Sequence, residues 1–374
     1  MEFALSADQE SLRDAARQLL EAESPLERVR RIVGPGAGAA GQGEESHASV
    51  ADFDRELWAS MIEQGWPSVE QPASSGGLGL GTVELVVLSE EIGRALAPVP
   101  FVGHCLALEA LRAAGEEGGP DSAAAGAWAE RLTAGDAIAC LGFTPGPSDG
   151  GPGTSAPRSE PTPFAPVADV AVVVGDEALF AVDLSENRPR PQPAMDRTRP
   201  LGWLALQGEP ALRLGGERAA RRVLDRAATA TAAQLLGASD RVLAMSVAYA
   251  SERVQFGRPI GGFQAVKHRL ADALVDIEGM RSGVYYAAWS LGAGEPDASL
   301  AASAAKAWSS DASRRVMATA LQVHGGIGFT WEHDLHLFVK RAQLDAVSYG
   351  DGDFHRDRVA GLLADRPAGA PSLF

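Results

Sequence analysis

A short segment between two helical stretches carries the residues best suited to bind a charged group. From Glu252 to Leu270 it reads ERVQFGRPIGGFQAVKHRL. Pro259 and the glycine pair that follows it prevent one continuous helix, so the chain must turn here. Arg253 stands beside this turn, and a guanidinium group presents a flat fork of donors that suits a pyrophosphate. A plain helical hairpin with one exposed arginine is the alternative that these residue types leave open.

Two later segments could also take part in chemistry. Residues Leu321 to Glu332 read LQVHGGIGFTWE, and the glycines would let backbone N–H groups approach phosphate oxygens closely. Residues Ser348 to Asp353 read SYGDGD, and a carboxylate in such a loop is a candidate for proton transfer. A glycine helix stop is the simpler explanation of the first segment. For the second, the simpler explanation is a solvated helix start that includes Asp353, His355 and Arg356.

Composition excludes several classes of function. The chain has 374 residues, a formal net charge of -16 and no basic block, which argues against binding to nucleic acid or to an anionic membrane surface. Cys105 and Cys140 lie far apart and the histidines are scattered, so we expect no metal site and a reduced, cytoplasmic setting. We read no signal peptide and no apolar stretch long enough for a membrane span.

The elements that must position these segments fall into three parts. Residues 1–136 are predicted to be helical, starting with a capping box at Ser6 and Gln9, and with Thr82 as the cap of a later helix. Short alternating or β-branched runs predict a β-domain at 137–214, a small barrel or sandwich. Residues 215–374 are predicted to form a bundle of long helices. In its first helix Gly237 indicates either a close helix crossing or a tolerated defect.

As written, these segments resemble the acyl-CoA dehydrogenase family. The Glu252–Leu270 segment is similar to the flavin-binding turn of that family, and LQVHGGIGFTWE is similar to its Gln-x-x-Gly-Gly-x-Gly segment. The run from Gly76 to Gly81 resembles the family's Gly-Gly-Leu-Gly turn. The resemblance implies an α+β fold: an N-terminal helical domain, a middle β-barrel or sandwich and a C-terminal four-helix bundle.

The same resemblance implies that FAD is the cofactor. Arg253 matches the arginine that contacts the FAD pyrophosphate, with Gln255 and Phe256 in the same motif. Phe263 and Gln264 match a pair near the adenine. The segment that lines the dinucleotide of a neighbouring subunit corresponds to Gln322, Val323, His324, Gly325 and Gly326. Because the family completes this site across subunits, we expect an oligomer, commonly a tetramer.

At the flavin ring the match is looser. The family's Thr-Glu-Pro-x-x-Gly-Ser-Asp stretch corresponds to the residues from Gly142 to Asp149, in which Thr144 and Ser148 could bond the ring. The family's glutamate in that stretch is missing here, and its Trp-Ile-Thr strand is not recognisable.

The family's catalytic glutamate has no direct counterpart. One family position falls on Tyr349, Gly350 or Asp351, and the other on Ala227, which carries no proton acceptor. Three hypotheses follow. Asp351 is the base; or the chain is a flavin-supporting subunit whose related partner supplies the glutamate; or the fold hosts another flavin reaction or none.

The resulting prediction is FAD-dependent α,β-dehydrogenation of an acyl-CoA thioester. Electrons would pass to an electron-transfer flavoprotein, and the protein would be a homotetramer or a heterotetramer with a related subunit.

Overall fold

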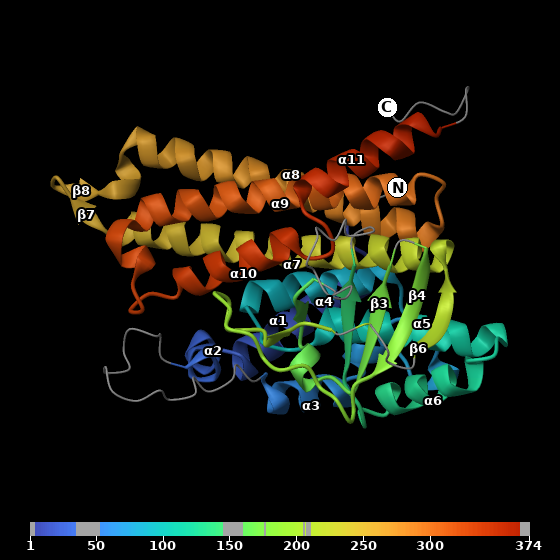
Figure 1. Cartoon of the computed structure of the whole chain (residues 1–374). Coiled ribbons are helices and arrows are strands. Elements are labelled where there is room, and N and C mark those ends of the chain that lie inside the picture. The colour runs from blue at the N-terminus through green and yellow to red at the C-terminus, as the bar shows by residue number, and fades with distance from the viewer. Residues whose placement is uncertain are drawn as a thin grey trace, which may run out of the picture.

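The computed structural model describes residues 4–34, 53–144, 160–175, 177–204, 206 and 211–366. Long helices form one half of the molecule, and shorter helices with a small sheet form the other half (Figure 1). A hairpin of β7 (Val254–Gln255) and β8 (Arg258–Pro259) projects from one end of the long helices, far from the sheet (Figure 1).

Six helices precede the sheet among the described residues: α1 (Ala7–Glu23), α2 (Leu26–Val33), α3 (Arg55–Glu63), α4 (Thr82–Ala95), α5 (Phe101–Glu117) and α6 (Ser122–Thr133). The capping box expected at Ser6 and Gln9 begins α1. The cap of α4 differs from the expectation, because Gly81 takes that position and its N–H donates to Glu84. The Thr82 hydroxyl instead donates to the partly buried Glu70 at 3.2 Å.

The main sheet contains β1 (Ala139–Phe143), β3 (Val170–Val174), β4 (Ala178–Asp183) and β6 (Ala211–Gly216), in the order β1-β3-β4-β6. β1 runs parallel to β3, and the other two pairs are antiparallel. A two-stranded sheet joins β2 (Thr162–Pro163) to β5 (Leu201–Gly202). In the part of the chain that is described, the main sheet keeps two open edges and is not closed into a barrel.

The carboxyl-terminal bundle consists of α7 (Glu217–Glu252), α8 (Gln264–Ala293), α9 (Ala298–His324), α10 (Leu335–Val347) and α11 (Gly352–Ala364). Helix α7 is 36 residues long and lies against α4, α8, α9 and α10. Its buried side chains include Leu235 and Val242, which share a hydrophobic cluster with Ile277, Met280 and Val316. The segment boundaries expected at 136/137 and 214/215 stay a prediction.

Helices α4 and α7 cross with their backbones in contact. A Cβ placed on Gly237 would overlap the carbonyl of Glu90, and one placed on Gly93 would overlap the carbonyl of Gln234. The two glycines are therefore required by reciprocal close approach, and of the two explanations offered for Gly237 the structure shows the close crossing.

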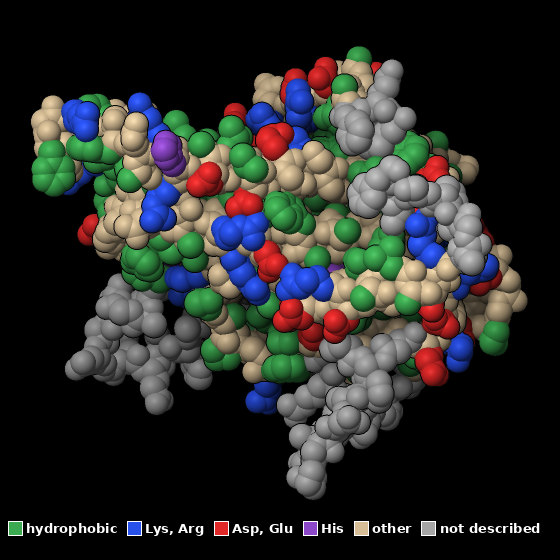
Figure 2. Space-filling model, turned by 90° about the horizontal axis from the view of Figure 1, so that it is seen from above, with side chains coloured by type: hydrophobic (Ala, Val, Ile, Leu, Met, Phe, Trp, Pro, Cys, Tyr) green, Lys and Arg blue, Asp and Glu red, His purple; other side chains and the backbone are tan. Residues whose placement is uncertain are grey.

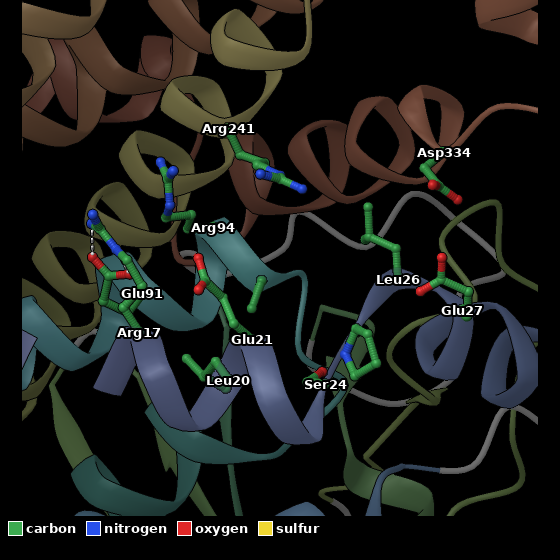
Figure 3. Close-up of a pocket in the computed structure, with 12 residues that line it drawn as sticks. Arg17, Leu20, Glu21, Ser24, Leu26, Glu27, Glu91, Arg94, Arg241 and Asp334 are labelled. Carbon is green, nitrogen blue, oxygen red and sulfur yellow. Dashed lines mark hydrogen bonds and ion pairs between the residues drawn. The ribbon is translucent and has the colours of Figure 1, made fainter. Parts of the chain in front are cut away.

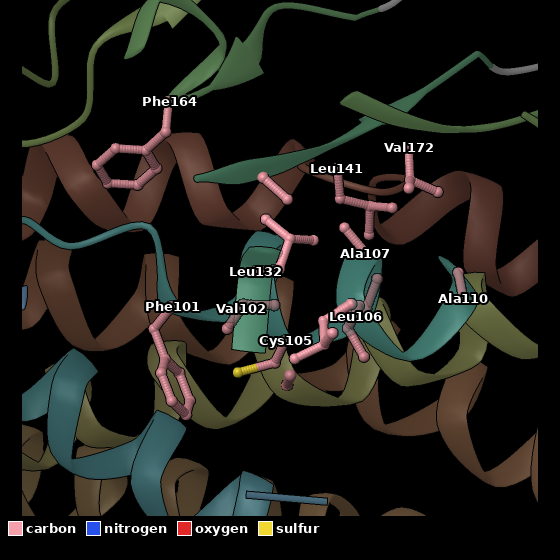
Figure 4. Packing of buried hydrophobic residues seen from close by; sticks show 14 of the residues in the cluster. Phe101, Val102, Cys105, Leu106, Ala107, Ala110, Leu132, Leu141, Phe164 and Val172 are labelled. Carbon is pink, nitrogen blue, oxygen red and sulfur yellow. The ribbon is translucent and has the colours of Figure 1, made fainter. Parts of the chain in front are cut away.

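A second hydrophobic cluster joins the first helices to the sheet. Figure 4 shows Val102 and Leu106 of α5 packed close to Leu132 of α6 and Leu141 of β1. The same buried cluster includes Tyr349, which lies between α10 and α11. Strand β1 is thus held between α5 and the loop that precedes the last helix.

No helix in the described ranges is both long and apolar enough to cross a membrane.

Candidate functional site

The turn after α7 is a two-stranded hairpin that stands out from the molecule. Arg253 follows the last helical residue, and β7 (Val254–Gln255) pairs with β8 (Arg258–Pro259). Both turn residues have positive φ, 53° at Phe256 and 79° at Gly257, as a tight two-residue hairpin turn requires. The Phe256 side chain is 93% exposed. Such exposure of a large aromatic ring at the tip of a projection indicates a contact surface.

The remaining residues of the hairpin are ordered by their own contacts. The guanidinium of Arg258 lies 4.1 Å from the ring centre of Phe263, and Phe256 meets Phe263 edge-on at 6.2 Å. The Gln255 amide donates to the Val254 carbonyl. Gln264 begins α8, and its side chain is exposed, as is that of Arg253. Hydrophobic and basic side chains gather on the projecting end in Figure 2.

The second predicted segment, Gln322–Gly326, lies beside the base of this hairpin. His324 ends α9, and its ring stacks on Tyr249, one turn before Arg253, with ring centres 4.6 Å apart. His324 Nδ1 donates to the Ala320 carbonyl at 2.9 Å. Burial lowers the pKa of His324, so the ring is neutral and packs as an aromatic residue. Val323 is buried with it.

The glycines of this segment face open space. A Cβ built on Gly325 or Gly326 would meet no atom within 4 Å, and Gly325 has φ 63°. The Gln322 side chain is exposed as well. Exposed backbone beside an exposed arginine can bind the phosphates of a dinucleotide. No part of the described chain covers this surface.

Thr144 and Ser148 were expected at the flavin ring. The Thr144 hydroxyl donates to the Val174 carbonyl at 3.1 Å. Its hydrogen is therefore already bonded to the end of β3. Ser148 lies outside the described residues. The dinucleotide end of the predicted site is thus better supported by geometry than the ring end.

The loop between α10 and α11 holds the candidate base. Asp351 is exposed, and its carboxylate accepts a hydrogen bond from Phe354 N at 2.9 Å, which makes it the N-cap of α11. A general base for α-proton abstraction needs a desolvated carboxylate with a raised pKa. The sequence placed Asp353, His355 and Arg356 at a solvated helix start. Asp353 and Arg356 are exposed, whereas His355 is fully buried.

A buried lysine lies beneath this loop. Lys306 of α9 has no exposed surface, and its Nζ donates to Ser310 Oγ (3.0 Å), the Ala346 carbonyl (3.1 Å) and the Gly350 carbonyl (2.9 Å). Burial lowers the pKa of Lys306 to about 7, against the opposing effect of Asp345, Glu160 and Asp351.

Glu160, from the sheet side, faces the same place. Its backbone N–H donates to the Phe143 carbonyl at 2.8 Å, at the end of β1. Burial raises the pKa of Glu160 to about 7, with Lys306 opposing this shift and Asp351 adding to it. The charges of Lys306, Glu160 and Asp351 therefore influence one another.

Sequence reasoning missed Lys306 and Glu160. Lys306 had a usable signal, because it keeps the helical phase of the buried Ala302, Ser309 and Ser313 and so lies on the core face of α9. Glu160 had none, because it follows a proline- and glycine-rich stretch with no period that could place it.

A crevice between α1, α4 and α7 also gathers charged residues. It has a volume of about 380 Å³ and is lined by Arg17, Glu21, Glu91, Arg94 and Arg241, among others. Figure 3 shows these side chains. Arg17 bonds Glu91 through two nitrogens, at 2.9 and 2.5 Å, and Arg94 pairs with Asp240. These ion pairs tie α1 and α4 to each other and α4 to α7, which is a structural task.

Comparison with known proteins identifies the family. The model of the acyl-CoA dehydrogenase N-terminal domain matches residues 6–119, and that of the C-terminal domain matches residues 215–363. The acyl-CoA dehydrogenase IpdE2 of Mycolicibacterium smegmatis is 32% identical over 347 residues, which is 92% of this chain and 96% of that protein. The chain belongs to the acyl-CoA dehydrogenase family. It is therefore a member of a family of flavoprotein oxidoreductases that act on acyl-CoA.

Two solved structures of this family are similar over nearly the whole chain. The ChsE4–ChsE5 complex from Mycobacterium tuberculosis has a TM-score of 0.82 at 28% identity, covering 98% of this chain and 100% of that one. A Tcur3481–Tcur3483 steroid ACAD has a TM-score of 0.79 at 26% identity, covering 96% and 98%. The predicted family and fold class are confirmed.

Proposed function

We propose that this chain is a subunit of an FAD-dependent acyl-CoA dehydrogenase that forms with a related chain. It contributes Arg253, the hairpin and the Gln322–Gly326 segment to FAD bound at the interface. The related chain contributes the carboxylate that removes the α-proton. FAD, when bound, accepts the β-hydride of the thioester.

The observation that carries this proposal is the state of the loop before α11. Its carboxylate, Asp351, is in solvent and caps a helix, while its buried side chain, Tyr349, belongs to the hydrophobic core. The loop thus lacks the desolvated acceptor that the reaction needs. By contrast, the hairpin and the open glycines have the exposure and the donors that a shared dinucleotide site requires.

Substrate and partners follow from the same proposal. A bulky, steroid-like acyl group is favoured by the similarity to the Tcur3481–Tcur3483 steroid ACAD. A hetero-oligomer is favoured by the similarity to the ChsE4–ChsE5 complex. We propose that the electrons leave through an electron-transfer flavoprotein and that the protein works in the cytoplasm.

Flavin content tests the proposal. The chain is purified alone and together with a paralogue that carries the family's loop glutamate, and FAD absorbance per chain is measured after gel filtration. We expect little FAD and no acyl-CoA-dependent bleaching for the chain alone, and both properties in the mixed oligomer. A chain that alone binds one FAD and is reduced by acyl-CoA contradicts the proposal.

A second candidate function is dehydrogenation with a base of this chain's own. The observation in its favour is that Asp351 and the partly buried Glu160, whose pKa is raised, lie around one loop. Under this hypothesis Asp351→Asn or Glu160→Gln abolishes flavin reduction while bound FAD is retained. Under the first proposal both variants keep the reduction rate of the mixed oligomer within about twofold of wild type, a difference near 0.4 kcal/mol in the barrier.

A further inference from the structure

Tyr349 has a backbone conformation that is unfavourable for its residue type. Its φ is 57°, in the left-handed region, and the next residue, Gly350, has φ 95°. A bulky residue persists there only where its surroundings hold it, and such positions cluster at functional sites. The side chain is only 8% exposed.

The Tyr349 ring fills the space between the loop and the sheet. Its hydroxyl donates to the Leu141 carbonyl of β1 at 3.3 Å, and its ring shares the buried cluster with Leu141, Phe143 and Ala227. Beside it, Phe143 and Phe354 meet edge-on at 5.6 Å. The open space next to this pair is a cavity of about 160 Å³, below the roughly 300–1,000 Å³ of small-molecule sites.

Contacts from three sides prevent the loop from moving aside. Lys306 bonds the Gly350 carbonyl, and His355 Nε2 donates to the Tyr349 carbonyl at 3.0 Å. At Gly350 the backbone is so close to Phe354 that a Cβ would overlap its ring. The glycines around Asp351 therefore serve close packing, and the loop flexibility that a short acidic side chain would need is not built in.

We propose that Tyr349 closes this chain's own acyl-CoA site, and that Lys306 and His355 hold it closed. The inference rests on the proposed function, because it takes the loop before α11 as the place where the thioester would meet its base. The Tyr349 ring and the Phe143–Phe354 pair already fill the space between this loop and β1, where an acyl group would have to lie to meet a base on the loop.

Removal of the ring is therefore expected to create a binding site. The test uses the mixed oligomer, with the loop glutamate of the partner replaced by glutamine to prevent turnover. Binding of octanoyl-CoA is counted by titration calorimetry, and free CoA, which lacks the acyl group, is the matched ligand control. Tyr349→Gly suits the left-handed backbone, Tyr349→Ala is the second variant, and Tyr349→Phe keeps the ring.

The wild type and Tyr349→Phe are expected to bind octanoyl-CoA only at the partner's site. Tyr349→Gly or Tyr349→Ala is expected to gain one site per copy of this chain. The inference is overturned if the wild type already binds one octanoyl-CoA at each copy of this chain, or if a folded ringless variant gains none. The wild-type count decides even if both ringless variants unfold.

Failure of this inference is distinguishable from failure of the proposed function. The proposed function fails if the unmodified mixed oligomer binds no FAD or does not oxidise acyl-CoA. The inference about Tyr349 concerns only how many acyl-CoA molecules bind, and it can fail in an oligomer that is fully active.

Discussion

The turn after α9 and the turn after α10 both contain glycines, but they differ in how closely other atoms approach those glycines. Gly326, after α9, faces open space, whereas Gly350, after α10, is crowded by Phe354 and His355. The first turn lies next to an arginine hairpin whose tip is exposed, and the second is joined to buried Lys306. Gly326 leaves space on the surface for another molecule, whereas Gly350 leaves space for Phe354 and His355 of the same chain. We therefore propose that the first turn, and not the second, is completed by another molecule.

The largest expected effect that sharpens this comparison concerns Lys306. Its folded-state pKa of about 7 lies below the ordinary value of 10.5, so between these pH values the unfolded chain binds the extra proton. The free energy of unfolding contributed by this group therefore rises with pH across that window. From pH 7 to 9.5 we expect wild type to gain roughly 3 kcal/mol relative to Lys306→Met, measured by denaturant unfolding.

Lys267→Met is the matched control, because Lys267 is exposed on α8 and should show no such difference. Parallel pH curves for wild type and Lys306→Met would show that the pKa of Lys306 is not lowered in the folded protein.

The next effect contrasts the two glycines directly. Gly350→Ala combines positive φ with overlap against Phe354, and we expect it to destabilise the fold by roughly 2–4 kcal/mol. Gly326→Ala meets no atom of this chain, so its melting temperature should match wild type while FAD retention by the oligomer falls. Thermal unfolding and flavin absorbance measure the two properties. Equal melting temperatures for both variants would remove the distinction between the turns.

Arg253→Ala is expected to act on cofactor binding alone. Loss of charge-assisted hydrogen bonds to a pyrophosphate is worth roughly 2 kcal/mol, which weakens FAD binding by about 10–100-fold. Arg253→Lys should recover part of this loss, because an ammonium cannot form the paired contact. Arg269→Ala, on the exposed surface of α8, is the control. Fluorescence titration with FAD measures the constants, and an unchanged value for Arg253→Ala excludes the assigned role.

The smallest effect concerns the cap of α11. Asp351→Ala removes the bond to Phe354 N and should destabilise the chain by about 1 kcal/mol, while Asp351→Asn keeps the cap and should be nearly neutral. Denaturant unfolding of the three proteins is the measurement. If Asp351→Asn were as unstable as Asp351→Ala, the side chain would be held by its charge and not as a cap.

Sequence predicted the helical framework and the position of the hairpin because both are local properties. A proline such as Pro259 breaks a helix in any context. Arg253 can be identified from the sequence motif that surrounds it. The residues around Gly350 were harder, because their surroundings come from distant segments. Tyr349 bonds to β1, 208 residues away in the chain. The charge of Lys306 lowers the pKa of Glu160, although the two residues lie far apart in the sequence. The burial of His355 was missed for the same reason, since two acidic neighbours suggested a solvated helix start.

The reciprocal glycines Gly93 and Gly237 have a mechanical consequence. The two backbones touch at these glycines. Sliding or rocking of α4 on α7 would open a gap between the main chains there, and the glycines have no side chains that could fill it. The amino-terminal helices and the bundle are thus expected to behave as one rigid body. Any breathing that admits a bulky ligand is then expected to use the sheet as its moving part, with a hinge in the short connection between α6 and β1.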